Sequence, residues 1–376
     1  MPFLSYKCLN SRPMVRVFVI LLSIFTLMYP NLALAGDVSA SLHIAYDTHA
    51  YDGEMFEAEG VRGDGESKLR RLKASSKVDF NDAISMKASL EYEVDDRKFV
   101  VDDFYLSGPF WAGMEFKLGQ FKEPFGLENL QSLKFQYLRE RSVATNAFTF
   151  SRERGFGLSK EAGRWYWEGA ISSIEDSGTA YTTRLAFAPL LKKKRFIHLG
   201  AGWSTRDGIK GKYDIDETVI AHSVGNLIHS ANYKPEFVNA GNIEFAARYR
   251  AFVIQSEAFW QDIQLEGNSY QLGGYYTSVL WTLMGRSREY KNGELDFDKP
   301  KKQTLELAAR FSMADLESRR DGQITEVLSV ALNYYFRDAL RLTLEYERAR
   351  LDSFYPRQWD TRTKGDSVSA RLQLIL

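Results

Sequence analysis

The sequence predicts an all-β protein, a transmembrane antiparallel β-barrel of about 16 strands. Two observations carry this prediction. Apolar and polar residues alternate with a period of two from about residue 37 to residue 376, and no apolar run of 18 or more residues follows the first 35. Aromatic residues at 14% and charged residues at 26% also suit a barrel with an apolar outside and a wet inside.

The alternation is clearest in three segments, 84–93, 305–312 and 340–347, each with one apolar and one charged or polar face. A soluble β-sandwich also alternates, so the pattern alone leaves both architectures open. The persistence of the pattern over more than 300 residues favours the barrel. Aromatic clusters such as 165–167 and 334–336, near the expected strand ends, favour it as well.

Residues 1–35 have the features of a secretory signal peptide. Lys7, Arg12 and Arg16 precede the apolar run 17–29, and Ala33-Leu34-Ala35 provides a cleavage site. Cleavage there would leave 46 Lys and Arg against 49 Asp and Glu in 36–376, a balance that gives no indication of nucleic-acid binding. The single cysteine would leave with the signal, so we expect no disulfide in the barrel domain, 36–376.

Turn signals divide the chain into sixteen expected strands, with long connections on the external side and short turns on the periplasmic side. Residues 286–301 fit this scheme poorly, because they form a long connection on the periplasmic side, and a missed or merged strand there would change the count to 14 or 18. The expected strands are 37–49, 66–80, 84–95, 98–106, 113–121, 155–161, 164–174, 178–188, 195–205, 241–250, 252–263, 270–285, 302–313, 323–336, 340–350 and 365–376.

One segment resembles a known family. Residues 119–128, GQFKEPFGLE, are followed by Leu138-Arg139-Glu140-Arg141 and by Asn146-Ala147-Phe148, and together they resemble the phosphate-selective porin O and P family. Residues 69–73, LRRLK, resemble the arginine-rich second strand of that family, and weaker matches extend over nearly all of 37–376.

The resemblance implies a trimeric, sixteen-stranded porin in the outer membrane of a Gram-negative bacterium. Its third external loop, here 122–154, would fold into the barrel, and basic residues would line the constriction. The expected function is a water-filled channel for passive diffusion of small anions, including phosphate or polyphosphate. The expected partners are small inorganic anions, outer-membrane lipid and further copies of the chain.

Basic residues at lumen-facing positions are the expected anion-binding groups, since arginine and lysine can replace the hydration of an oxyanion. Arg71, Lys73 and Lys77 share the polar face of the second strand. Arg70 has the lipid-facing parity, so we expect it either to lie in the rim or loop or to be turned by a bulge. Lys73 stands where the family tends to have another arginine. The expected pore-lining residues are Arg70, Arg71, Lys73, Asp103, Lys122, Lys134, Arg139 and Arg141.

Acidic residues at lumen-facing positions, including Glu91 and Glu345, keep a weakly selective general porin open as an alternative. An adhesin or receptor built on the loops 122–154 and 206–240 is a further alternative. A barrel enzyme is disfavoured because no nucleophile or phosphate-loop motif is present. We expect no cofactor. We also expect no metal site, because His222 and His229 lack the spacing of metal ligands.

Overall fold

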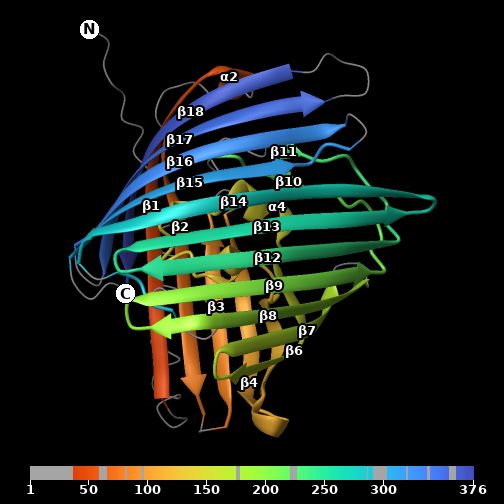
Figure 1. Cartoon of the computed structure of the whole chain (residues 1–376), viewed down its shortest axis with the longest axis vertical. Coiled ribbons are helices and arrows are strands. Elements are labelled where there is room, and N and C mark those ends of the chain that lie inside the picture. The colour runs from red at the N-terminus through yellow and green to blue at the C-terminus, as the bar shows by residue number, and fades with distance from the viewer. Residues whose placement is uncertain are drawn as a thin grey trace.

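The protein is a closed antiparallel β-barrel in a computed structural model that describes residues 37–58, 66–80, 83–94, 97–174, 178–220, 227–285, 287–290, 303–318, 321–336, 339–354 and 361–376. Sixteen strands form the ring, and the first strand pairs with the last (Figure 1). Because the ring closes, no strand edge is left unpaired, which is the requirement for a sheet in lipid. Within the described residues, no helix has the length and apolar character needed to span a membrane.

The barrel strands, with the labels of Figure 1, run as follows: β1 (Asp37–Asp52), β2 (Glu66–Asp79), β3 (Ser85–Glu93), β4 (Lys98–Pro109), β5 (Glu115–Lys122), β6 (Arg152–Ala162), β7 (Trp165–Ile174), β8 (Gly178–Lys192), β9 (Arg195–Asp207), β12 (Phe237–Tyr249), β13 (Phe252–Leu265), β14 (Asn268–Met284), β15 (Thr304–Asp315), β16 (Gly322–Tyr335), β17 (Leu340–Phe354) and β18 (Thr361–Ile375). Short elements lie in the connections: α2 (Glu54–Ala58), a 3₁₀ turn (Trp111–Gly113), α3 (Leu127–Leu130), α4 (Val143–Phe148), β10 (Asp216–Glu217) and β11 (Ile228–His229).

The predicted sixteen-stranded barrel is confirmed, and each expected strand overlaps one observed strand. Strand β14 pairs directly with β15, so the connection 286–301 does not change the count. Strand β8 extends to Lys192 rather than ending at residue 188, because the register shift between Phe187 and Leu190 accommodates Pro189. The predicted signal peptide, 1–35, lies outside the described residues.

The two faces of each strand have opposite characters. On β15, Leu307 and Phe311 are each 37% exposed on the outside, whereas Glu306 is fully buried and Arg310 is 3% exposed on the inside. A soluble sandwich buries its apolar face, so this inverted arrangement is typical of a barrel in lipid. The alternation seen in the sequence therefore separates a lipid-facing surface from a charged interior.

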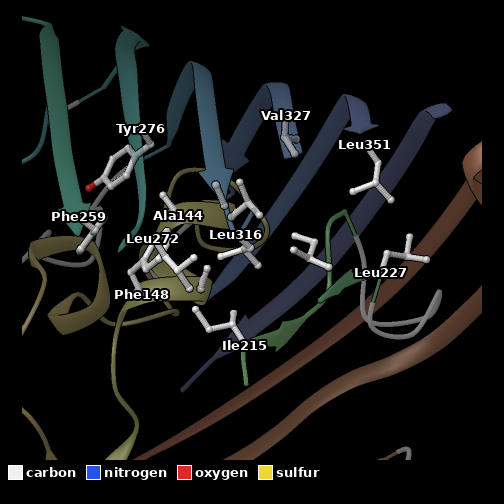
Figure 2. Packing of buried hydrophobic residues seen from close by; sticks show 14 of the residues in the cluster. Ala144, Phe148, Ile215, Leu227, Phe259, Leu272, Tyr276, Leu316, Val327 and Leu351 are labelled. Atoms are coloured by element: carbon white, nitrogen blue, oxygen red, sulfur yellow. The ribbon is translucent and has the colours of Figure 1, made fainter. Parts of the chain in front are cut away.

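The interior is not uniformly polar. Phe259 and Tyr276 on the strands belong to one buried apolar cluster with Phe148 of α4 and with Ile215 and Leu227 of the long external connection 208–236 (Figure 2). The connection that contains α4 and the connection 208–236 thus both contribute apolar side chains to this cluster. The cluster also includes inward-facing residues of β12–β14 and β16–β17. This packing fixes the connections against one side of the barrel wall by removing apolar surface from water.

Candidate functional site

The turn that begins the segment 123–151 explains much of the GQFKEPFGLE motif. Gly126 has a φ of 82°, a conformation that glycine adopts with little strain, and an added Cβ would lie 2.8 Å from Cγ2 of Thr149. The next two backbone N–H groups, of Leu127 and Glu128, donate to the carboxylate of Glu257 on β13 at 2.6 and 2.7 Å. The motif therefore encodes a turn that is held on the inner wall of the barrel.

Glu128 and Asn129 then fix the two halves of the segment to each other. The Glu128 carboxylate accepts hydrogen bonds from the Ser142 N–H at 2.9 Å and from the Thr145 hydroxyl at 2.6 Å, at the start of α4. It also pairs with Arg310 of β15 at 3.0 Å. The Asn129 side chain donates to the carbonyl groups of residues 125 and 150. Residues 123–151 thus form a compact unit bonded to the inward faces of several strands.

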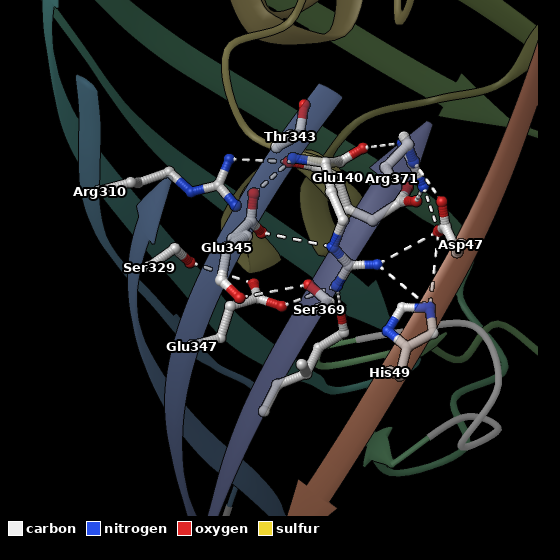
Figure 3. Close-up of polar contacts among 12 residues, drawn as sticks. Asp47, His49, Glu140, Arg310, Ser329, Thr343, Glu345, Glu347, Ser369 and Arg371 are labelled. Atoms are coloured by element: carbon white, nitrogen blue, oxygen red, sulfur yellow. Dashed lines mark hydrogen bonds and ion pairs between the residues drawn. The ribbon is translucent and has the colours of Figure 1, made fainter. Parts of the chain in front are cut away.

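Arg139, one of the predicted pore-lining residues, has a different position. Its guanidinium is 3.3 Å from Asp47 of β1 and 3.0 Å from Glu347 of β17, and its side chain is almost fully buried. Figure 3 labels these two carboxylates among the polar residues of this region. The Arg139 N–H also donates to Glu345 at 2.8 Å. Arg139 does not line the cavity described below. It neutralises inward-facing acidic residues and holds the segment against β1 and β17.

A cavity of about 860 Å³ remains between residues 129–151 and the inner wall formed by β1–β5. Its charged lining has nine basic residues and seven acidic ones, an excess of two positive charges. The basic residues are Arg70, Arg71, Lys73, Lys87, Lys117, Lys122, Lys134, Arg141 and Arg152, and the acidic residues are Glu91, Glu93, Asp102, Asp103, Glu140, Glu168 and Glu217. Seven of the eight predicted residues are among them.

A bulge in the second strand brings Arg70 to this cavity. Arg71 pairs with Ala45 and Leu69 pairs with Tyr46, so Arg70 is the extra residue on β2. The bulge turns Arg70 inward, where its Nε lies 3.2 Å from Glu140. The alternation rule alone would have placed Arg70 in lipid, and the bulge removes that conflict.

Three of the six predicted cations in the cavity, Arg70, Arg71 and Lys73, pair with acidic residues. Arg71 pairs with Glu91 at 2.9 Å, and Lys73 pairs with both Glu91 and Asp102. Asp103 accepts from Arg152 Nε at 2.6 Å and pairs with Lys87 Nζ at 3.0 Å. The Lys134 ammonium donates to the Ser41 hydroxyl at 2.6 Å. Pairing keeps these side chains ordered along the wall and reduces the field that each presents to a solute.

Lys122 and Arg141 differ from that group. Lys122 Nζ donates to the carbonyl of Asn129 at 2.5 Å, and Arg141 Nη2 donates to the same carbonyl at 3.1 Å. These distances leave the two nitrogen atoms no more than about 5.6 Å apart. Among the described residues, neither cation forms an ion pair with a carboxylate, and Nε of Arg141 is buried without a hydrogen-bond partner.

Two neighbouring nitrogen donors, from Lys122 and Arg141, share one neutral acceptor here. Burial lowers the pKa of Arg141 to about 10, so its guanidinium remains charged near neutral pH. An oxyanion can accept hydrogen bonds from both groups at once, through different oxygen atoms. The pair is therefore the part of the cavity best suited to binding an anion.

Glu217 is a cavity residue that the sequence reasoning missed. It lies on β10, within the external connection 208–236, and it is brought to the cavity only by the packing of that connection. Burial and the neighbouring charge of Asp216 raise the pKa of Glu217 to about 7. Lys87 and Lys117 were also missed, although their inward position on β3 and β5 follows the polar face of those strands.

The comparisons with known proteins agree with this geometry. Residues 38–376 match the family model of the phosphate-selective porins O and P. The chain belongs to the phosphate-selective porin O and P family. A curated relative in that family, Porin O of Pseudomonas aeruginosa, is 24% identical over 307 residues, which cover 69% of this chain and 70% of the relative.

Solved structures of outer-membrane barrels have the same fold. The trimer form of OmpT from Vibrio cholerae is 12% identical, with a TM-score of 0.58, over 90% of this chain and 99% of that one. The anion-selective porin from Comamonas acidovorans is 11% identical, with a TM-score of 0.54, over the same shares. As a member of the phosphate-selective porin O and P family, the chain is a channel protein of the Gram-negative outer membrane and not an enzyme.

Proposed function

We propose that the protein is an anion-selective porin and that Lys122 and Arg141 form the anion-binding point of its channel. The observation that supports this most directly is the convergence of both cations on the Asn129 carbonyl, without a carboxylate partner among the described residues. The three acidic side chains Glu123, Glu128 and Glu140 of the same segment are each paired with an arginine elsewhere, and none of them forms an ion pair with Lys122 or Arg141 in the part of the chain that the structure describes.

Residues 123–151 act in this proposal as the constriction of the channel. They are bonded to the inward-facing residues Glu257, Glu345 and Asn333 of three different strands. A solute passing between this segment and β2–β5 would cross the cavity that holds Lys122 and Arg141. The name of the curated relative's family and the anion selectivity of the Comamonas acidovorans porin support the assignment of anions as solutes.

The solute class that fits the pair is a small tetrahedral oxyanion such as phosphate. Two donors no more than about 5.6 Å apart can bind separate oxygen atoms of one such ion. The test is a planar-bilayer measurement of chloride current through the purified protein while inorganic phosphate is added. We expect phosphate to reduce the chloride current along a saturable curve. A current unaffected by phosphate would contradict phosphate binding.

A weakly selective general porin is the second candidate, and the near balance of the cavity charges favours it. Nine basic residues face seven acidic ones, and several form pairs across the wall. That reading predicts a reversal potential close to zero in a salt gradient and a current that rises linearly with phosphate concentration. The anion-selective proposal predicts a reversal potential of the sign given by anion flow. It also predicts a phosphate current that saturates as the phosphate concentration rises.

A homotrimer is also part of the proposal. Ala40, Ser76 and Ala88 lie in one cross-strand row that continues to the lipid-facing Phe104. Small outward residues allow close approach of a second barrel in the membrane. The trimer form of Vibrio cholerae OmpT supports this arrangement. Cross-linking of the purified protein should give a trimer, and a monomer alone would contradict it.

A further inference from the structure

A second group of cations lies outside the channel, at the end of the barrel with the short turns. It consists of Arg164, Lys192, Lys193, Lys194, Arg195 and Arg250, which we call the basic rim. All six residues are exposed. They come from the adjacent strand connections β6–β7, β8–β9 and β12–β13, which span about 24 Å at the usual strand spacing.

The structure fixes the three turns relative to one another. The Arg250 N–H donates to the Lys194 carbonyl at 2.9 Å, and the Arg164 guanidinium donates to the Pro189 carbonyl at 2.8 Å. Within the described part of the chain, none of the six cations forms an ion pair with a carboxylate, including the exposed Glu161 on β6. The rim is therefore a preformed patch of one sign of charge.

The rim lies at the level where lipid meets water. The residues Lys192, Arg195, Tyr249, Phe252 and Trp281 form one continuous cross-strand row. Tyr249 is 52% exposed, Phe252 48% and Trp281 42%, as expected for an aromatic girdle on the outer surface. The Arg195 guanidinium lies 4.7 Å from the centre of the Tyr249 ring. Cations and girdle aromatics thus share the outward face.

We infer that the basic rim binds the anionic headgroups of phospholipids in the periplasmic leaflet of the outer membrane. The short turns place it on the periplasmic side. Lysine and arginine beside an anionic lipid surface each strengthen association by roughly fivefold. Arginine can also donate two hydrogen bonds to one phosphate group. The rim faces outward, away from the cavity, so this role is independent of the proposed anion conduction.

The test compares the full-length folded protein with a triple variant, K192Q/K194Q/R195Q, by native mass spectrometry in detergent. Titrations with phosphatidylglycerol and phosphatidylcholine give the preference for the anionic lipid. We expect the wild-type preference to fall at least about fivefold in the variant. A matched control, K210Q/K212Q/K364Q, removes three exposed cations at the opposite end of the barrel and should keep the wild-type preference.

Four results would overturn the inference. An unchanged lipid preference in the rim variant, or an equal fall in the control, would show that these positions are not specific. Displacement of bound phosphatidylglycerol by excess inorganic phosphate would indicate a site for free anions rather than for lipid. A changed anion-to-cation permeability ratio in the rim variant would place the rim in the conduction path. A wild-type permeability ratio in the rim variant, together with a lost preference for phosphatidylglycerol, supports lipid binding by the rim. That result holds even if the wild-type channel proves unselective between anions and cations.

Discussion

Removing the cationic pair should lower the anion preference of the channel. The perturbation is the double substitution K122Q/R141Q, which retains hydrogen-bond donors near the Asn129 carbonyl but removes both charges. The cavity lining would change from nine basic and seven acidic residues to seven of each. The fold should persist, because both residues bond to a single carbonyl and neither is part of an ion pair among the described residues.

The expected magnitude follows from Coulomb's law. A monovalent anion about 4 Å from one positive charge gains about 1 kcal/mol in water and about 4 kcal/mol at an effective dielectric constant near 20. The lower figure is appropriate for a hydrated cavity, and it corresponds to roughly a fivefold change in anion occupancy for each charge. The double variant should therefore lose up to roughly 25-fold in anion-to-cation permeability ratio at low salt, the full value applying when both groups are charged, and less at high salt because of screening.

The assay is the reversal potential of purified protein in planar bilayers under a potassium chloride gradient. The matched control is K117Q/E168Q, which removes both members of a cavity ion pair whose atoms are 2.7 Å apart and leaves the net charge unchanged. The control should keep the wild-type ratio. If the K122Q/R141Q channel inserts and retains the wild-type ratio, or if the control loses as much, the role given to this pair is wrong.

Three further predictions concern the groups around the pair. Glu217 is neutral below its raised pKa of about 7 and negative above it, so the anion preference of the channel should fall as the pH rises through 7. Reversal potentials measured between pH 5 and pH 9 should show this fall in the wild type and not in Glu217→Gln. A fall that persists in the variant would assign the pH dependence to another group. Glu257→Ala removes two hydrogen bonds from the turn at Leu127 and Glu128, worth about 0.5–1.5 kcal/mol each, so open-channel current noise and proteolysis of the segment should both increase. Unchanged noise would count against an anchoring role. Gly126→Ala should lower the thermal unfolding temperature, measured by the loss of heat-modifiable gel mobility, through backbone strain of about 1–2 kcal/mol and through the contact with Thr149. In the control, Gly163→Ala, the glycine has a positive φ but its added Cβ would have no neighbouring atom within 4 Å, so the unfolding temperature should fall less. Equal falls in the unfolding temperature would show that the Thr149 contact contributes nothing.

The barrel could be predicted from the sequence because its determinants are local. Inward and outward positions alternate along every strand, and segments such as 305–312 display that period without reference to any other part of the chain. The bulge at Arg70 was one of two alternatives that the sequence left open, since a charged residue with lipid-facing parity lies either in a rim or loop or in an irregular strand. The positions of the cations in the candidate site could be predicted only in part. Arg139 and Arg141 are two residues apart in one basic stretch, yet one neutralises Asp47 and Glu347 while the other faces the cavity.

The sequence by itself determined the alternation, a barrel of about 16 strands, the family and most of the predicted residues that carry charge inside the barrel. Only the tertiary structure decided which of those charges are compensated. Glu128 meets Arg310, and Glu217 reaches the cavity, because connections far apart in the sequence pack together inside the ring. The physical reason is that strand periodicity depends on neighbouring residues, whereas the electrostatic potential at a point depends on every charge close to it in space.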